Sequence, residues 1–476
     1  MTALSPWLTL EEVARVTGGS VAAPAPSGAA FAGCAIDSRS LRGGELFVPL
    51  PGTRADGHDF IAAALEAGAA GSLARRGWKG TGAAPAKPIV LVDDPLRALQ
   101  ALGGHCRERS GAPAVGVTGS NGKTTTKEMI AAVLGTTRRV HRNVGNLNNH
   151  IGVPLTLTWL RPEHQVLVIE MGMSARGEIR DLAAMVRPSI GVLTNASEAH
   201  LEQLRSVEEV ARAKSELAEA LPPDGLLVVN ADDRLLWPMN RSRPVRKRSF
   251  ALENAEADLR PTRLEVTAAG GTRFTLEDGT AFTLALLGRH NVRNALAAIA
   301  VGDELGVPRA LAAEALAALR PAKHRLELIQ ARGLTVLDDA YNANPASMAA
   351  ALALLGSIEA RGARRAVLGD MLELGPASDA LHEAVGRAVP PAAWLYAAGA
   401  FAAAIERGAR AAGVPKARAR RFDSVPAMAA AVVSDAAPGD LVLVKASRGM
   451  RLERVVDALV EGNAGAGRAL AGGGRV

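Results

Sequence analysis

The sequence has few cysteines, few aromatic residues and no long apolar run. Cys34 and Cys106 are the only cysteines in 476 residues, so they cannot build a disulfide framework, and their spacing is not that of a metal site. Aromatic residues make up only 3% of the chain, so the core must consist mainly of alanine, leucine and valine. No apolar run approaches the roughly 18–20 residues of a membrane span. These absences predict a soluble protein of the reducing cytoplasm.

The first residues also lack the pattern of a secretory signal peptide. Glu11 and Glu12 stand where a signal peptide has an apolar segment after a basic start, so we expect none. The content of 48% hydrophobic and 22% charged residues is typical of a globular protein, and the length predicts two to four domains. No pattern indicates obligate assembly, so we expect a monomer.

The net charge of +7 makes a nucleic-acid partner one hypothesis to consider. The basic clusters at 241–248 and 416–421 contain no interleaved aromatic residues and lie on no recognisable nucleic-acid motif. We therefore expect no nucleic-acid partner. A basic field also suits a small, highly anionic substrate.

The most informative motif is a glycine-rich loop, TGSNGKTT at 118–125, between an apolar run at 114–117 and a helical pattern at 123–134. Small residues let backbone N–H groups approach phosphate oxygens, and the helix dipole favours an anion there. Lys123 would reach the β- and γ-phosphates, and the Thr124 hydroxyl would hold Mg²⁺. Val117 stands where the strict motif has its first glycine. The pattern predicts a nucleotide site formed by Gly119, Ser120, Asn121, Gly122, Lys123, Thr124 and Thr125.

The hydrophobic pattern divides the chain into three α/β regions, 1–95, 96–319 and 320–476, with Pro321 as the expected hinge. The first region is mixed, and the Gly/Ala-rich end of the chain from about 462 predicts a disordered tail. In the two larger regions, short apolar segments alternate with helical patterns, which is typical of doubly wound parallel sheets. Strands are expected at 165–169, 190–194, 225–229, 334–337, 365–368, 394–397 and 441–444.

Polar residues follow two of the expected central strands. Glu170 ends the first, and Thr194 ends the second, with His200 soon after. Ligands of parallel α/β sheets lie at the carboxyl ends of strands. A carboxylate and an imidazole near Thr124 therefore predict a divalent-metal site, although each alone is also explained as a solvated or packed side chain.

Three further positions have ordinary structural explanations. Lys214 lies on a strongly helical stretch, where a surface lysine is expected. Asn291 precedes an alanine-rich helix over 295–300 and would serve as its N-cap. The segment 338–345, DDAYNANP, closes an apolar strand with two acids, two asparagines and a tyrosine. It indicates either a binding segment or an Asx-type turn that caps the next helix.

Together these segments resemble the Mur ligase family over nearly the whole chain, and most closely the branch that adds D-alanyl-D-alanine. The Asp-Asn-Pro-Arg motif of the diaminopimelate-adding branch is absent. In KASR at 445–448, Ala446 replaces the usual glycine. The other segments that carry the resemblance are DSR at 37–39, GELFV at 44–48, DGHDF at 56–60, the loop at 118–125, GNLNNHIGVP at 145–154, the segment at 338–345, and GDMLELG at 369–375 with His382.

The resemblance implies three domains: a mixed α/β UDP-sugar-binding domain, a central P-loop ATPase domain with a doubly wound parallel sheet, and a C-terminal Rossmann-like α/β domain. The implied activity is ATP-dependent ligation of D-alanyl-D-alanine to UDP-N-acetylmuramoyl-tripeptide through an acyl phosphate, in peptidoglycan precursor synthesis. ATP and two Mg²⁺ ions are the implied cofactors.

The resemblance also implies roles for individual residues. Lys214 corresponds to a lysine that is carbamylated in the family, and with Glu170 and His200 it would hold one Mg²⁺. Thr124 and Glu170 would hold the other, and Lys123 would act with Lys214, His200 and Arg325 in catalysis. Further implied contacts are Asn291, Asn294, Arg325, Asp339 and Asn344 for the nucleotide, and Ser38, Arg39, Asn148, Asn149, Lys445, Ser447 and Arg448 for the other substrates.

Three other interpretations remain open. The first is another ligase of the same fold, such as a different Mur step, a folylpolyglutamate synthase or a cyanophycin-type enzyme; the UDP-domain segments argue against the folate branch, and 338–345 against other Mur steps. The second is a regulatory nucleotide-binding module, which the intact candidate catalytic residues disfavour. The third is a nucleic-acid-dependent ATPase, which rests on the charge alone.

Overall fold

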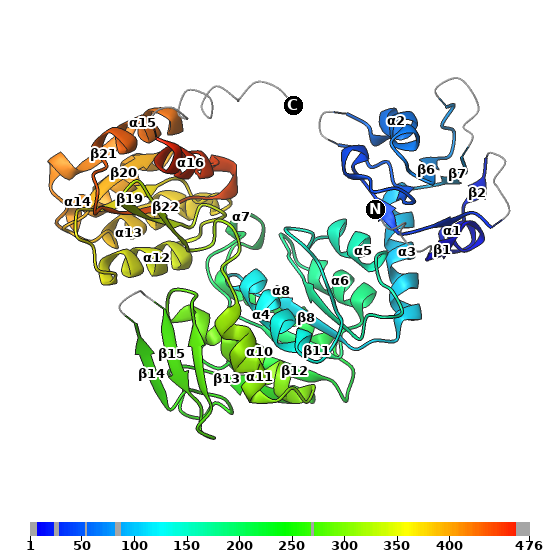
Figure 1. Cartoon of the computed structure of the whole chain (residues 1–476), viewed down its shortest axis with the longest axis horizontal. Helices are drawn as coiled ribbons and strands as arrows, with labels where there is room; N and C mark the ends of the chain where they lie inside the picture. Colours follow the sequence, from blue (N-terminus) through cyan, green and yellow to red (C-terminus); the bar gives the residue numbers. More distant parts are fainter. Residues whose placement is uncertain (1–6, 23–27, 53–54, 81–86, 268–270, 463–476) are drawn as a thin grey trace.

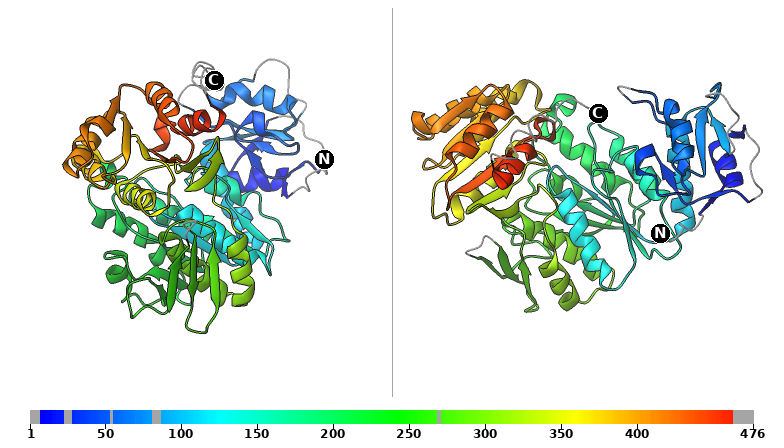
Figure 2. Two further views of the ribbon diagram at one scale, coloured as in Figure 1. Left: turned by 60° about the vertical axis from the view of Figure 1, so that its left-hand side comes forward. Right: turned by 45° about the horizontal axis from the view of Figure 1, so that its top comes forward.

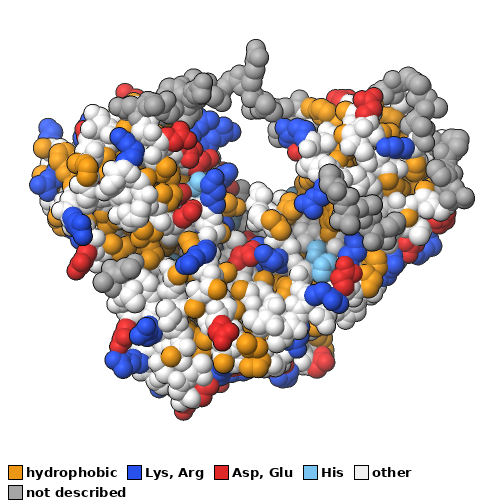
Figure 3. All heavy atoms as spheres, in the orientation of Figure 1, with side chains coloured by type: hydrophobic (Ala, Val, Ile, Leu, Met, Phe, Trp, Pro, Cys, Tyr) orange, Lys and Arg blue, Asp and Glu red, His pale blue; other side chains and the backbone are white. Residues whose placement is uncertain are grey.

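The computed structural model describes residues 7–22, 28–52, 55–80, 87–267 and 271–462 (Figure 1). The tail predicted from about 462 lies outside these ranges except for its first residue. Three α/β units follow one another along the chain. In the views of Figures 1 and 2, the central unit (cyan to green) joins the two outer units, and the space-filling view of Figure 3 shows an opening between them.

The N-terminal unit is built on a five-stranded sheet in the order β2-β7-β6-β5-β4, in which only β2 is antiparallel to its neighbour. A capping box begins α1, where Thr9 and Glu12 exchange side-chain and backbone hydrogen bonds. The elements are β1 Leu8–Thr9, α1 Leu10–Thr17, β2 Ser20–Val21, β3 Ala30–Phe31, β4 Cys34–Ala35, η1 Ser38–Ser40, β5 Leu46–Phe47, η2 Gly57–Phe60, α2 Ile61–Glu66, β6 Gly71–Arg75 and β7 Ile89–Val92.

The central unit contains a six-stranded parallel sheet in the order β13-β12-β11-β8-β10-β9, which confirms the doubly wound arrangement. One apolar core joins α4, α10 and α11 to one face, and a second joins α5, α6, α8 and α9 to the other. The elements are α3 Pro95–Ser110, β8 Ala114–Thr118, α4 Lys123–Gly135, β9 Val140–Arg142, α5 Gly152–Leu157, β10 Val166–Glu170, α6 Glu178–Val186, β11 Ile190–Leu193, α7 Leu201–Leu204, α8 Val207–Glu219, β12 Leu226–Asn230, α9 Leu236–Asn240, β13 Arg246–Phe250, α10 His290–Glu304 and α11 Arg309–Ala318.

The strand order determines where the site can form. Because β8 lies between β10 and β11, the loop that follows β8 emerges between the ends of the other two strands. Glu170 is in register with Val117, and Leu193 with Thr118. The polar residues that follow β10 and β11 therefore lie on either side of the glycine-rich loop.

A three-stranded antiparallel sheet, β14-β15-β16, lies between β13 and α10 in the chain and was not predicted. Its buried Phe274 and Phe282 stack with ring centroids 5.1 Å apart and join the core shared by α4, α10 and α11. The strands are β14 Arg263–Val266, β15 Thr272–Thr275 and β16 Ala281–Leu284.

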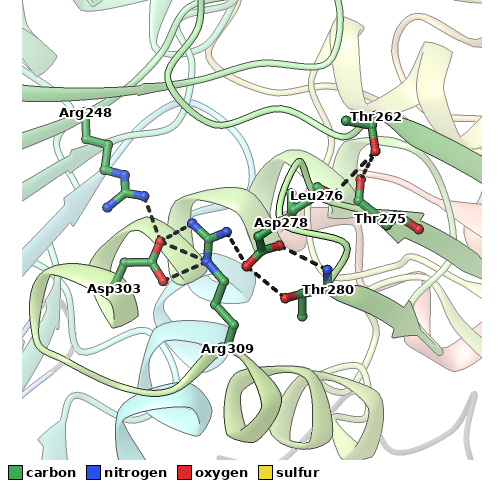
Figure 4. A network of polar contacts seen from close by, with 8 residues as sticks. All are labelled: Arg248, Thr262, Thr275, Leu276, Asp278, Thr280, Asp303 and Arg309. Atoms are coloured by element: carbon green, nitrogen blue, oxygen red, sulfur yellow. Dashed lines mark hydrogen bonds and ion pairs between the residues drawn. The ribbon is translucent and has the colours of Figure 1, made fainter.

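A network of ion pairs ties this sheet to the helices (Figure 4). Arg309, at the start of α11, contacts Asp303 of α10 at 2.7 Å and Asp278 of the β15–β16 turn at 2.9 Å. Asp303 also pairs with Arg248 of β13 at 2.7 Å. The Asp278 carboxylate in turn accepts hydrogen bonds from the N–H and hydroxyl of Thr280, so one arginine links the turn to both helices.

The C-terminal unit has a six-stranded sheet in the order β17-β18-β22-β19-β20-β21, parallel except for β17. Helices α12, α13 and α14 share one apolar core with it, and α15 and α16 share a second, as the layers in Figure 1 show. The elements are β17 Glu327–Ala331, β18 Leu334–Asp338, α12 Pro345–Ser357, β19 Arg364–Leu368, η3 Gly375–Ala377, α13 Ser378–Arg387, β20 Trp394–Ala398, α14 Ala402–Ala411, η4 Lys416–Arg418, β21 Ala419–Phe422, α15 Val425–Asp435, β22 Leu441–Lys445, η5 Arg448–Met450 and α16 Glu453–Glu461.

A tryptophan contact fixes the N-terminal unit to the central one. The Trp159 indole N–H donates to the Cys34 carbonyl oxygen at 3.0 Å, and the Thr158 hydroxyl accepts from the Cys34 N–H at 3.1 Å. The Trp159 ring lies so close to Gly33 that a Cβ on Gly33 would come within 3.0 Å of it.

Among the helices of the described residues, none is long and apolar enough to cross a membrane.

Candidate active site

The glycine-rich loop adopts a conformation that only glycine permits at two positions. Gly119 has φ of 156°, and a Cβ there would lie 1.8 Å from the Thr194 hydroxyl oxygen. Gly122 has φ of 78° and is the N-cap of α4, where a Cβ would lie 2.6 Å from Asn294 Oδ1. Side chains are rarely tolerated at such φ values, and here neighbouring atoms also fill the space.

The loop leaves the N-terminus of α4 available for an anion. Among the residues that the structure describes, no side chain caps α4, so the positive dipole end of the helix is left open toward the cavity. Asn195, which follows β11, holds the preceding residues: its carbonyl oxygen accepts from Ser120 N–H at 2.8 Å, and its Oδ1 accepts from Asn121 N–H at 2.9 Å. This arrangement is typical of a phosphate-binding loop.

Lys123 lies folded against the loop. Its ammonium donates to the carbonyl oxygens of Gly119 at 2.6 Å and Ser120 at 3.2 Å. Burial lowers its pKa, with the charge of Arg325 adding to that effect and Glu170 opposing it. Lys123 and Arg325 thus form a paired positive region beside the loop, which an anionic ligand would stabilise.

The Glu170 carboxylate is 2% exposed and held on both oxygens. The Thr124 hydroxyl donates to Oε2 at 2.8 Å, and the Asn148 amide donates to Oε1 at 2.7 Å. Lys127, which the sequence analysis did not single out, is fully buried with its ammonium 3.9 Å from Oε2. Lys127 lies one turn after Lys123 and is among the buried residues of α4, so its spacing from Lys123 could have indicated a buried, functional lysine.

Adjacent hard oxygens of Thr124 and Glu170 fit Mg²⁺, which binds one or two protein oxygens together with substrate phosphates. His200 is engaged elsewhere, since its Nδ1 lies 2.6 Å from Glu373 Oε2 of the C-terminal unit. The hydrogen bond from His200 lowers the pKa of Glu373. Within the described ranges, no three His, Cys, Asp or Glu side chains are gathered as a ready metal site.

Lys214 is 1% exposed on α8, so the surface-lysine interpretation is wrong. Burial lowers its pKa well below the ordinary value, and the nearby Lys123 charge lowers it further, whereas Asp233 opposes the shift. A lysine in these surroundings is favoured in its neutral, nucleophilic form.

The two asparagines of α10 lie beside the loop. The N-cap interpretation of Asn291 is wrong, because α10 begins at His290 with Arg289 as its N-cap. The Asn291 amide donates to the Leu287 carbonyl oxygen at 2.8 Å, and its Oδ1 accepts from the Asn294 amide at 2.9 Å. Both side chains are buried, and the Asn294 amide lies next to Gly122.

The segment 338–345 both caps a helix and contacts the loop. Asn344 is the N-cap of α12 and forms a capping box with Ser347, as the turn interpretation predicted. Its amide also donates to Asn121 Oδ1 at 2.8 Å, which joins the C-terminal unit to the phosphate loop. Asp339 lies 2.6 Å from the buried Lys445 ammonium, which also donates to the Asn342 carbonyl oxygen at 2.8 Å.

Most of the predicted site residues line one cavity of about 800 Å³ between the central and C-terminal units. Four predicted site residues lie outside its lining: Gly119, Lys214, Ser38 and Arg39. Arg39 is exposed on the N-terminal unit and pairs with Asp37 at 2.9 Å. The predicted residues that do line it are Ser120, Asn121, Gly122, Lys123, Thr124, Thr125, Asn148, Asn149, Glu170, His200, Asn291, Asn294, Arg325, Asp339, Asn344, Lys445, Ser447 and Arg448.

Family models match the chain in three successive parts: Mur ligase family, catalytic domain, at 30–104; Mur ligase middle domain at 117–302; and Mur ligase, glutamate ligase domain, at 324–448. A relative from Bacillus subtilis, named UDP-N-acetylmuramoyl-tripeptide--D-alanyl-D-alanine ligase, is 40% identical over 459 residues, which are 95% of this chain and 98% of the relative. The chain belongs to the Mur ligase family.

Solved Mur ligase structures agree with the observed fold. MurF from Acinetobacter baumannii superposes with a TM-score of 0.84 and 30% identity, covering 96% of this chain and 100% of that one. MurF from Thermotoga maritima in complex with ADP has a TM-score of 0.76 and 29% identity, covering 90% and 97%. These matches confirm the resemblance to a MurF-type Mur ligase and the three-domain α/β architecture.

Proposed function

We propose that the chain is the ATP-dependent ligase that joins D-alanyl-D-alanine to UDP-N-acetylmuramoyl-tripeptide during cytoplasmic peptidoglycan precursor synthesis. The observation that carries the proposal is the contact between Asn121 of the glycine-rich loop and Asn344 of the C-terminal unit, because both residues line one cavity between the two units. Support for the substrate class comes from the relative named for this reaction, which matches over 95% of the chain.

Activation of a carboxylate is the chemical problem that ATP solves. The terminal carboxylate of the tripeptide attacks the γ-phosphorus, the bond to ADP breaks, and an acyl phosphate forms. The D-alanyl-D-alanine amine then attacks the acyl carbon and loses a proton. The tetrahedral intermediate collapses to the amide and releases phosphate.

Several negative charges meet in this reaction, so catalysis depends mainly on positioning and charge neutralisation. Lys123 and Arg325, whose charges already influence each other, would neutralise the transferred phosphoryl group. The uncapped first turn of α4 would bind phosphate oxygens. Further nucleotide contacts are proposed at Asn291, Asn294, Asp339 and Asn344, and contacts to the other substrates at Ser38, Arg39, Asn148, Asn149, Lys445, Ser447 and Arg448.

Thr124 and Glu170 would hold one Mg²⁺ through their adjacent oxygens. A second would be held by Glu170, by His200 after its release from Glu373, and by a carbamate on Lys214. The neutral Lys214 amine would form that carbamate by adding to CO₂ and losing a proton, which converts a buried amine into an oxygen anion. Bound Mg²⁺ supplies positive charge to the phosphate oxygens.

Phosphate release tests the ligase assignment against the regulatory and nucleic-acid alternatives. With ATP and Mg²⁺, phosphate release should require both the UDP-tripeptide and D-alanyl-D-alanine, because the acyl phosphate forms only from the first and is consumed by the second. Reactions that omit one co-substrate at a time, or add DNA or RNA, are the controls. Phosphate release without either co-substrate, or stimulation by nucleic acid, would refute the assignment.

A further inference from the structure

Arg325 lies between two residues with unusual backbone conformations. His324 has φ of 62° and Leu326 has φ of 51°, both in the left-handed region that residues other than glycine rarely adopt. The turn immediately precedes β17, so it lies where the chain passes from the central to the C-terminal unit. A backbone of this kind persists only where neighbouring contacts hold it.

Several of those contacts come from one short segment, 338–341, which begins at the last residue of β18. His324 Nδ1 lies 2.6 Å from Asp338 Oδ2, and the Asp338 carboxylate is 1% exposed. The Tyr341 N–H donates to the His324 carbonyl oxygen at 3.1 Å. On the other side, the Leu326 N–H donates to Asp339 Oδ1 at 3.2 Å. Both left-handed residues are therefore fixed to the C-terminal sheet.

The same segment also holds the Arg325 side chain. Its guanidinium lies over the Tyr341 ring, 4.0 Å from the ring centroid. Arg325, Leu326, Asp339 and Tyr341 line the cavity, whereas His324 and Asp338 do not. Any effect of His324 on a ligand in the cavity must therefore pass through its neighbours.

We propose that His324 and Asp338 are positioning residues that present Arg325 to the transferred phosphoryl group. The inference rests on the proposed function, in which Arg325 neutralises that group. The His324–Asp338 contact holds the left-handed turn, and the turn directs the guanidinium into the cavity from the C-terminal unit. Asp338 thereby has a role distinct from that of its neighbour Asp339, which contacts Leu326 and Lys445.

The test combines His324→Gly with Arg325→Ala. Glycine accepts the left-handed backbone but loses the contact with Asp338, so kcat should fall about 100-fold, as for a misplaced catalytic group, while the KM for D-alanyl-D-alanine stays unchanged. The double variant should be no slower than Arg325→Ala alone. His324→Asn should recover most of the rate, because asparagine tolerates this conformation and its amide can donate to Asp338.

Arg332→Gly is the matched control, because Arg332 is another left-handed residue of the same unit, with φ of 54°, in the turn between β17 and β18. Its kcat should match the parent enzyme. If His324→Gly keeps full activity while Arg325→Ala is impaired, positioning is refuted and the proposed function stands. If His324→Gly slows the Arg325→Ala enzyme by the same factor as the parent, the two residues act independently and the inference also fails.

Discussion

Replacing Lys123 by alanine should abolish ATP-dependent ligation, lowering kcat by about 1,000-fold or more. The ammonium lies inside the loop, 2.6 Å from the Gly119 carbonyl oxygen and next to the first turn of α4. The Arg325 guanidinium, whose charge influences Lys123 in the parent protein, would remain without its positive partner. The negative charge on the transferred phosphoryl group would then be compensated less completely.

The measurement is ADP formation with saturating UDP-tripeptide and D-alanyl-D-alanine. Lys416→Ala is a suitable control, because Lys416 is an exposed lysine in η4 of the C-terminal unit. It should leave kcat unchanged, and the unfolding temperature of both variants should stay close to that of the parent. Near-normal turnover of Lys123→Ala would show that the loop at 118–125 does not bind the reacting phosphates.

Lys214→Ala should be almost inactive and partly rescued by short-chain carboxylates such as acetate. The lysine is buried, and its lowered pKa increases the neutral fraction that can react with CO₂ at neutral pH. Because a carbamate requires the neutral amine, its formation should decrease as the pH falls through that lowered pKa. Alanine leaves a space in which a small carboxylate can replace the carbamate oxygens.

ADP formation across a concentration series of acetate measures the rescue. Lys123→Ala provides the matched control, because it removes a positive charge that a carboxylate cannot replace, so acetate should not restore it. Lys214→Glu should retain more activity than Lys214→Ala, since it carries a carboxylate at a similar position. Full activity of Lys214→Ala without any additive would refute the carbamate.

Local patterns were sufficient to predict the sheets and the loop. Apolar runs bounded by helical patterns identify buried parallel strands, and their ends locate Glu170 and Thr194 beside the loop, as the register confirms. Asn344 could also be predicted as the N-cap of a helix, because Pro345 follows it and Ser347 lies three residues later. These signals depend on neighbours in the chain, so the sequence contains them directly.

Features set by distant contacts were not predictable from local patterns. The strands β14, β15 and β16 are short, and the alternating residues of β15 and β16 are buried by joining the core that contains α10 and α11. Burial of Lys214 depends on helix packing, and the pairing of His200 with Glu373 joins residues 173 positions apart. Asn291 was misplaced because the helix begins at His290, one residue before it.

The most direct test of the central claim supplies the purified protein with ATP, Mg²⁺ and UDP-N-acetylmuramoyl-tripeptide, and compares D-alanyl-D-alanine with diaminopimelate as the amine. ADP formation and the mass of the UDP-linked product are followed together. The account predicts ADP and a product extended by D-alanyl-D-alanine with the first amine, and neither with the second. Ligation of diaminopimelate, or ADP formation without an extended product, would contradict it.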